Sequence, residues 1–298
     1  MLRTIGVLAT NFIGVISGVL GIYQAGNLYW KSWIKIPETA IAVVFVCLIA
    51  VYYFIMYVFR SATMEKKTRY ADALSSINGG LEVLNAVNRL HGPIERELDP
   101  NSKQQVLTHF EGLCDSFADA FKLITSSECA VSIKILEKIR DENNESQLVV
   151  RTLCRSRNSS GRRNKDNYAK TKNIHHTLNS NTAYRDALGS PHGYYFNNYL
   201  PFDYEYNSTN FDVENKRPHR TNPILRWHNW PLSYKSGIVT SIMPADGIGI
   251  HDLPQSSIGF LCVDSTQMGV FHRKYDLNIL QGASKAIFNS LERFKNIL

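Results

Sequence analysis

Basic side chains are concentrated between Arg151 and Lys172, and this segment is the one most suited to bind an anion. It holds eight Lys and Arg residues against the single Asp166, a local charge of +7 that equals the net charge of the whole 298-residue chain. Guanidinium groups bind phosphate through paired hydrogen bonds, so the segment could hold nucleotide phosphates or anionic lipid. A solvated loop would have the same composition. The candidate anion-binding residues are Arg151, Arg155, Arg157, Arg162 and Arg163.

Cysteine and histidine residues show no spacing that predicts a metal site or a disulfide. The cysteines are odd in number and no two stand in a C-x-x-C pair, and the pair His175-His176 has no partner at ligand spacing. We therefore expect buried free thiols in a reducing compartment and no bound metal. The basic surplus is local and modest, so we expect no DNA or RNA partner. The five cysteines are Cys47, Cys114, Cys129, Cys154 and Cys262.

Two uncharged segments near the N-terminus are long enough to cross a membrane. Residues 39–59 carry no charge between Glu38 and Arg60, and 21 residues of helix span a hydrocarbon core of roughly 30 Å. Residues 4–29 are a weaker run, and no small-residue cleavage site follows them as it would in a signal peptide. We predict a transmembrane helical hairpin over residues 1–60, with helices at about 4–29 and 39–59.

Three residues of the first segment are candidates for helix packing within the membrane. Gly14 and Gly18 form a G-x-x-x-G pair, which lets two helix backbones approach closely in lipid. The amide of Asn11 needs a hydrogen-bond partner in hydrocarbon, and a neighbouring helix or a second protomer would supply it. We therefore expect a homodimer or a higher oligomer.

The Lys and Arg residues that flank the two segments predict the orientation. The loop between the segments has two of them, whereas the outer flanks have five: Arg3, Arg60, Lys66, Lys67 and Arg69. By the positive-inside rule both termini lie in the cytoplasm. The chain is then a multi-pass protein of the inner (cytoplasmic) membrane, and everything after residue 60 is cytosolic.

Residues 61–100 predict an amphipathic connecting helix and a linker. Apolar residues recur in steps of three and four from Tyr70 to Val87, and Gly79-Gly80 weakens the helical pattern. Such a stripe could form a dimeric coiled coil or pack on its own domain. The turn residues that follow, up to residue 101, place a domain boundary there.

The cytosolic domain, residues 101–298, has the element pattern of an α+β fold. Helical periodicity over residues 102–125 is followed by alternating strands over 129–154, which read as a hairpin. A short helix near 181–188 and strands at 237–243 and 257–263 come next, and a helix begins at Asp276. We predict an antiparallel sheet with flanking helices.

Two short motifs of this domain resemble those of GAF domains. The run from Ile258 to Ser265, followed by Phe271 and the helix that opens at Asp276, looks like the end of a GAF domain. The run Tyr234-Lys-Ser236, which leads into a strand, resembles the aromatic-x-Ser turn of that family. The resemblance implies a sensory, dimerising module that holds a small molecule between the sheet and its covering loops.

The resemblance also implies which residues line the ligand pocket. Aromatic rings would stack on a planar ligand, while Arg and Asn would hydrogen-bond its edges or a phosphate. Each of them could instead serve packing alone. The resemblance makes a nucleotide one possible ligand. No signature of cyclic-nucleotide phosphodiesterases or of bilin attachment is found, and no cofactor is expected. The candidate ligand-binding residues are Tyr184, Arg185, Asp186, Tyr194, Tyr195, Asn197, Asn198, Trp227, Tyr234 and Ser236.

These features together predict a membrane-anchored sensor rather than an enzyme. The architecture resembles small bacterial membrane effectors, in which a nucleotide-sensing domain controls a two-helix membrane unit. The first alternative is a scaffold that dimerises or recruits a partner at the membrane without a ligand. A remote alternative is a cysteine-dependent reductase of the GAF fold, in which Cys154 would be activated by Arg151 and Arg155.

Overall fold

The computed structural model describes residues 38–90, 100–140, 146–157, 176–213, 217–218, 222–244 and 257–294, together with Gly18 and Gly21. The chain divides into two compact units, Met1–Met64 and Glu65–Leu298, and each is described by itself. Most of the first predicted membrane helix, with Asn11 and Gly14, lies outside the described residues, as do Arg162 and Arg163.

Helix α2 (Glu38–Leu90) contains the second predicted membrane helix. Among the described residues, one helical stretch, Phe45–Ala86, is long and apolar enough to cross a membrane, with a mean hydropathy of 1.8 in its most apolar window. None of that window is buried, and side chains such as Phe54 and Phe59 are each 68% exposed. This confirms one long apolar helix and suggests membrane association. The hairpin and its orientation stay predictions.

The remainder of α2 packs on its own domain through one stripe of side chains. Ala73, Ile77 and Leu84 are buried in the same core cluster as α3 (Pro100–Thr125), whereas Leu74 is 45% exposed. The helix continues through Gly79-Gly80. Gly80 lets α2 approach α3 closely, since a Cβ there would lie 3.0 Å from side-chain atoms of Leu113 and Ser116. The sequence left open whether this stripe forms a dimeric coiled coil or packs on its own domain, and the structure shows that it packs on its own domain.

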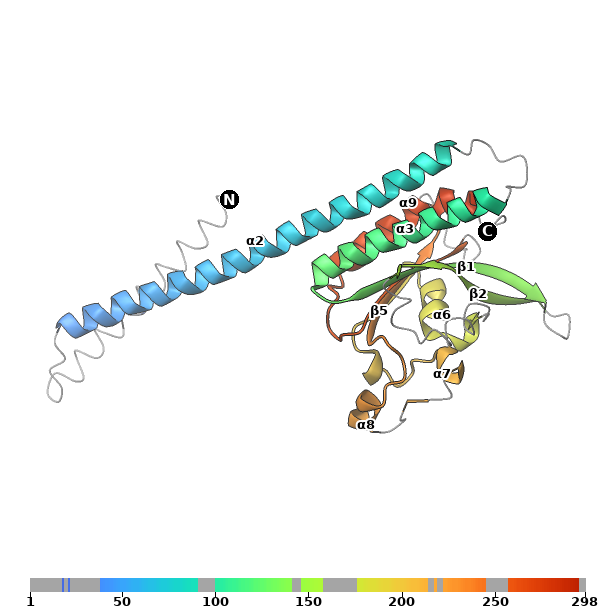
Figure 1. Ribbon diagram of the computed structural model, residues 1–298. Coiled ribbons are helices and arrows are strands. Elements are labelled where there is room, and N and C mark those ends of the chain that lie inside the picture. The colour runs from blue at the N-terminus through green and yellow to red at the C-terminus, as the bar shows by residue number, and fades with distance from the viewer. Residues whose placement is uncertain are drawn as a thin grey trace. The chain divides into compact units, whose positions relative to one another are not determined.

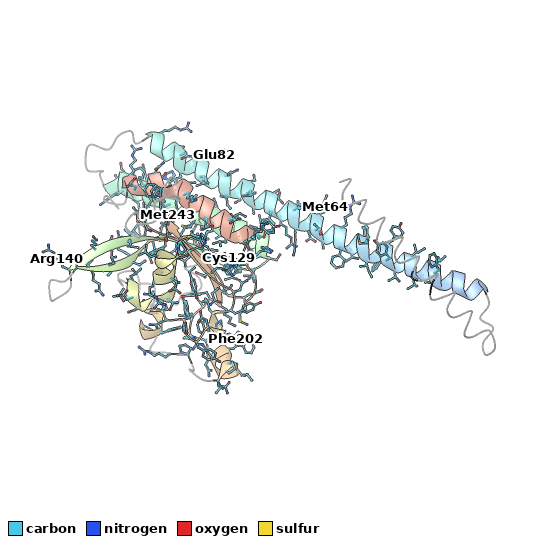
Figure 2. All side chains as sticks on the ribbon, turned by 180° about the vertical axis from the view of Figure 1, so that it is seen from behind. Met64, Glu82, Cys129, Arg140, Phe202 and Met243 are labelled. Atoms are coloured by element: carbon cyan, nitrogen blue, oxygen red, sulfur yellow. The ribbon has the colours of Figure 1, made fainter. Side chains whose placement is uncertain are left out.

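Six strands form one antiparallel sheet in the order β3-β2-β1-β6-β5-β4. Strands β1 and β2 make the long predicted hairpin, and Arg140 marks its far end (Figure 2). The strands are β1 (Cys129–Arg140), β2 (Ser146–Arg155), β3 (His176–Thr177), β4 (Tyr194–Asn197), β5 (Ser236–Ile242) and β6 (Gly259–Ser265).

Helices cover both faces of this sheet. On one face α3 and α9 (Tyr275–Phe294) lie side by side (Figure 1), and the rings of Phe110 and Phe294 meet between them. The opposite face is covered by short helices and turns. These are η1 (Leu178–Ser180), α6 (Thr182–Gly189), η2 (Leu200–Phe202), α7 (Asn210–Val213) and α8 (Pro223–His228).

The alternation of side chains along the central strands builds a separate core on each face. Leu261 and Val263 of β6 belong to the cluster with α3 and α9, whereas Phe260 and Cys262 belong to the cluster with α6. At Gly259 a Cβ would lie 2.1 Å from the Lys134 carbonyl oxygen, so only glycine lets β6 approach β1 there. The predicted α+β class, an antiparallel sheet with flanking helices, is confirmed.

Candidate functional site

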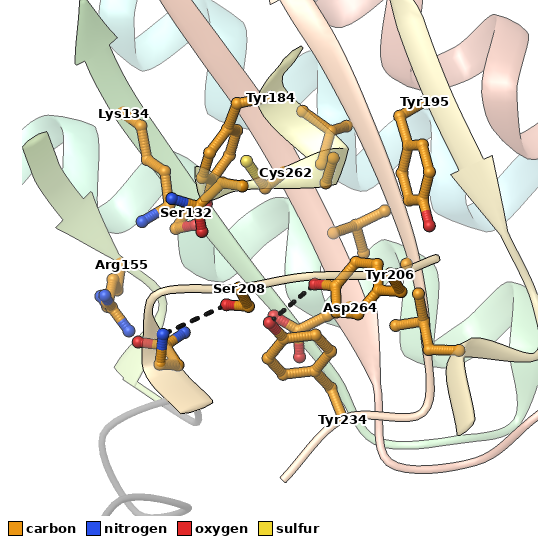
Figure 3. Close-up of a pocket in the computed structure, with 17 residues that line it drawn as sticks. Ser132, Lys134, Arg155, Tyr184, Tyr195, Tyr206, Ser208, Tyr234, Cys262 and Asp264 are labelled. Carbon is orange, nitrogen blue, oxygen red and sulfur yellow. Dashed lines mark hydrogen bonds between the residues drawn. The ribbon is translucent and has the colours of Figure 1, made fainter. Parts of the chain in front are cut away.

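A pocket lies between the sheet and the short helices, on the face away from α3 and α9 (Figure 3). Its space is ≈ 620 Å³ when the open mouth and the solvent in it are included. Strands and loops far apart in the sequence contribute its walls, so both polar and aromatic groups converge on one space.

The sheet supplies the charged wall of the pocket. Ser132 and Lys134 stand two residues apart on β1, as do Cys262 and Asp264 on β6, so each pair projects from the same face of its strand. Arg155 at the end of β2 is paired with Ser132 in the ladder. Two cations therefore face the pocket beside one carboxylate. Gly237, Val239 and Val263 complete this wall.

A β-bulge places the two cations around one hydroxyl group. The register between β1 and β2 shifts after Ile133, so that Thr152 stands opposite Lys134 and Arg155 opposite Ser132. Lys134 Nζ donates to Thr152 Oγ1 at 2.8 Å, and Arg155 Nη2 donates to the same oxygen at 3.1 Å. Lys134 is only 6% exposed, so its charge is held inside the domain.

Four tyrosines line the pocket: Tyr184 stands beside Lys134, whereas Tyr195, Tyr206 and Tyr234 lie across the pocket from Lys134 and Arg155 (Figure 3). The Tyr184 ring lies 5.5 Å from Lys134 Nζ, close enough for a cation–π contact. The hydroxyl groups of Tyr206 and Tyr234 are 3.1 Å apart. Burial raises the pKa of both Tyr195 and Tyr206 above its ordinary value, so these phenols stay neutral donors and acceptors. Asn181, Ala183, Leu200, Ser208 and Asn210 fill the gaps between the rings.

Cys262 is the one thiol that lines this pocket in the described part of the chain. Burial raises its pKa to about 11, although the Lys134 cation and a hydrogen bond with Ser132 act in the opposite direction. The thiol is therefore protonated at neutral pH and is a poor nucleophile.

Asp203 fixes the position of the tyrosine side of the pocket through hydrogen bonds. Its carboxylate accepts hydrogen bonds from Asn197 Nδ2 at 2.8 Å and from the Tyr195 hydroxyl at 3.4 Å. Its backbone carbonyl accepts from the buried Arg226 guanidinium at 2.6 Å. Trp230 Nε1 similarly donates to the Tyr234 carbonyl at 2.7 Å. These bonds fix the loops that carry Tyr195 and Tyr234.

Among the described candidates from the sequence, the pocket brings together Arg155, Tyr184, Tyr195 and Tyr234. The other basic candidates are paired elsewhere. Arg151 forms an ion pair with Glu137 at 2.8 Å. Arg157 forms one with Asp115 on α3 at 2.6 Å. The basic segment thus contributes one described residue to the pocket.

The remaining candidates lie around the pocket rather than in its lining. Arg185 and Asp186 pair with each other at 2.9 Å, and Tyr194 packs against the core on the α3 side. Asn197 bonds to Asp203, whereas Asn198 bonds through both amide atoms to the backbone of Phe271. Ser236 donates to the Gln267 carbonyl, and Trp227 is 43% exposed beside Lys235.

Ser132, Lys134, Tyr206 and Asp264 are pocket residues that sequence reasoning missed. Ser132 and Lys134 alternate with apolar residues in the sequence, a pattern that indicated a strand of the hairpin and no site. In the structure β1 lies inside the sheet and a second layer covers its polar face. Lys134 is 94% buried in a central strand, which marks a candidate site. Its burial becomes known only when the second layer over the sheet is in place.

Comparisons with known proteins give structural likeness at low sequence identity. No family model and no curated protein matches the sequence. A GAF domain region of a putative membrane protein from Geobacter sulfurreducens is 14% identical, with a TM-score of 0.38 over 64% of this chain and 97% of that one. A GAF domain of a phosphoenolpyruvate-protein phosphotransferase from Acinetobacter is 9% identical, with a TM-score of 0.40 over 76% and 95%.

An enzyme is also among the similar structures. A type II free methionine-R-sulfoxide reductase from Thermoplasma acidophilum is 12% identical, with a TM-score of 0.38 over 64% of this chain and 96% of that one. The fold class of this chain rests on the strand order and helix packing described above.

Proposed function

We propose that this chain is a membrane-anchored sensor whose GAF-like cytosolic domain binds a small ligand in the pocket between β1, β6 and the tyrosine wall. The observation that carries the proposal is the buried Lys134, which faces a pocket whose lining also includes Arg155, Asp264 and four tyrosines. A core that served stability alone would replace such a charge with an apolar side chain. A nucleotide is the ligand class that suits cations beside aromatic rings.

A route from the pocket to α2 supports the sensor role. Strand β6 ends at Ser265, directly after the pocket residue Asp264, and the loop that follows is bonded to Asn198 through Phe271. The loop leads into α9, where Asp276 accepts a hydrogen bond from the Tyr70 hydroxyl of α2 at 2.7 Å. A ligand that favours one arrangement of this loop would shift the position of α2.

Helix α2 would carry the signal to the membrane, since its bounds include the apolar segment. We propose that the membrane part is a two-helix hairpin with both termini in the cytoplasm, in the inner membrane, and that the chain works as a dimer or higher oligomer. The output is then a rearrangement of the membrane helices, as in a membrane effector.

The test is the melting temperature of the full chain in detergent against a panel of linear, cyclic and dinucleotides. A ligand present at about 100 times its Kd stabilises the folded state by roughly 2.7 kcal/mol, which raises the melting temperature by several degrees. Tyr184→Ala removes a pocket wall and should abolish the rise. Tyr204→Ala, at a tyrosine outside the pocket that is 48% exposed, should keep it.

A panel that leaves the melting temperature unchanged would favour the scaffold alternative. One observation supports that alternative: large apolar side chains are exposed around η2 and α8, the end of the domain that Phe202 marks in Figure 2. They would suit a protein partner. The exposed side chains are Phe202, Tyr204, Ile224, Leu225 and Trp227.

We propose no enzymatic activity for the cysteines. Cys154 is buried against α3, with its Sγ 3.7 Å from that of Cys114, whose pKa is raised by burial. Cys262 faces the pocket but is protonated at neutral pH. A methionine sulfoxide reductase activity that disappears in both Cys154→Ser and Cys262→Ser would contradict this proposal.

A further inference from the structure

The two cations of the pocket are held unusually close together. Lys134 Nζ and Arg155 Nη2 both donate to Thr152 Oγ1, so the two nitrogen atoms are no more than 5.9 Å apart, the sum of the two bond lengths. Like charges at this separation repel each other, and the repulsion is stronger where water is excluded, as it is around Lys134. An anion between them would remove that repulsion.

The charge of the lining defines the anion further. Lys134 and Arg155 converge on Thr152 Oγ1 at the pocket wall, and Asp264 is the one carboxylate among the lining residues. Ser132, the ladder partner of Arg155, adds a hydroxyl group beside them. A phosphate monoester carries close to two negative charges at neutral pH and offers three acceptor oxygens, whereas a diester or a carboxylate carries one charge.

The opposite wall defines the rest of the ligand. Tyr184 stands next to Lys134, and the bonded pair of Tyr206 and Tyr234 lies across the pocket. A planar body would stack on these rings and hydrogen-bond to the neutral phenols.

We propose that Lys134 and Arg155 form the subsite for the terminal phosphate of a small phosphate monoester whose planar ring lies against the tyrosine wall. The inference rests on the proposed sensor function and names the ligand class of the same pocket. It places charge recognition on β1 and β2, at the bulge beside Thr152, and not on the loop that follows β2.

The test compares two probes of nearly equal size, phenyl phosphate and methyl phenyl phosphate, with phenol as the uncharged probe. The full chain in detergent is melted at constant ionic strength. Phenyl phosphate at about 20 times a millimolar Kd should raise the melting temperature by about 4 °C. The diester should bind about tenfold more weakly, because it loses one charge-assisted interaction, and phenol should have no effect.

Variants assign the effect to the two cations. Lys134→Met and Arg155→Gln should each abolish the rise with phenyl phosphate, while Lys134→Arg should retain it. Lys138→Met, on the same strand but exposed and outside the pocket, is the matched control and should also retain it. Cooperative melting without any probe establishes that each variant folds.

Three outcomes would overturn the subsite. They are the absence of a rise with phenyl phosphate in the parent chain, an equal rise with phenol, and a rise that persists in both Lys134→Met and Arg155→Gln. A nucleotide of the wider panel that stabilises the parent chain and both Lys134→Met and Arg155→Gln equally would also overturn the phosphate subsite and leave the small-molecule sensor standing. A parent chain that is stabilised neither by phenyl phosphate nor by any nucleotide of the panel would count against the sensor itself.

Discussion

At the scale of single residues, burial decides how each polar group of the pocket behaves. Lys134 is held inside the domain, with Thr152 and the Tyr184 ring as close partners. Tyr195 and Tyr206 keep their protons because burial raises the pKa of each. The pocket therefore offers basic side chains beside neutral hydroxyl groups, and its Cys262 thiol is protonated at neutral pH.

The raised pKa of the Cys262 thiol can be tested through its reactivity. With a pKa of about 11, about one thiol in several thousand is ionised at pH 7.4, so alkylation by iodoacetamide should be slow in the native chain. The rate should keep rising as the pH approaches 11, because only the thiolate reacts. Peptide-resolved mass spectrometry measures it, and the same peptide in denaturant is the control. A rate that levels off below pH 8 would contradict the raised pKa.

At the scale of elements, the short helices and loops over the pocket have a different role from the layer of long helices on the other face. The segments between α6 and β5 cover the pocket wall that the sheet supplies, and they are held by side-chain bonds such as those of Asp203. Helices α3 and α9 and the part of α2 that packs with them form a continuous apolar core on the other face. This layer, rather than the pocket, provides most of the hydrophobic burial of the domain, so the pocket can keep polar groups.

Replacing Leu84 tests the contribution of α2 to that core. Leu84 is 1% exposed, so Leu84→Ala should lower the free energy of unfolding by about 2–4 kcal/mol through lost burial and a cavity. The neighbouring Val83 is 50% exposed, and Val83→Ala should change it by less than about 0.5 kcal/mol. Urea unfolding of both variants measures the difference. Equal effects would show that this stripe does not pack on the domain.

At the scale of the whole molecule, a polar α+β domain and a long apolar helix share one chain. Large apolar side chains of α2 between Val46 and Phe59 are exposed to their surroundings, which a water-soluble protein would avoid over such a length. Lipid is the environment that suits them. The proposed function depends on this combination, because a ligand in the domain acts on the membrane only through the chain that joins them.

Cys47 lies within the predicted membrane helix at 39–59, so its labelling tests whether lipid surrounds this segment. It is exposed on the protein itself, whereas the other four cysteines are buried. In native membranes a water-soluble maleimide should therefore fail to label the chain, because lipid covers Cys47, and labelling should appear after detergent denaturation.

The control for this experiment is Met64→Cys, at a position that is 58% exposed and lies beyond the predicted membrane helix at 39–59. It should be labelled in inverted vesicles and protected in intact cells if the domain is cytoplasmic. Labelling of Cys47 in membranes at the rate of Met64→Cys would argue against a lipid-embedded helix.

Much of the fold could be predicted from the sequence, because local pattern determines local elements. The helix at 102–125 is observed as α3, and the strand at 237–243 as β5, with shifts of one or two residues. Four pocket residues were also among the candidates, Arg155, Tyr184, Tyr195 and Tyr234, since aromatic and basic types suit ligand contact. The other described candidates pair with residues outside the pocket, pack against the core or lie exposed, and residue type cannot distinguish these roles from lining a pocket.

The sequence by itself determined the apolar helix, the α+β class and the surplus of positive charge, because each is a property of composition or of period along the chain. Only the tertiary structure decided where the pocket lies and which charges enter it. The bulge after Ile133 brings Thr152 and Arg155 to the same face of β2 although they stand three residues apart, and the cover buries Lys134. Both depend on strand pairing and layer packing, which join residues whose separation in sequence carries no periodic signal.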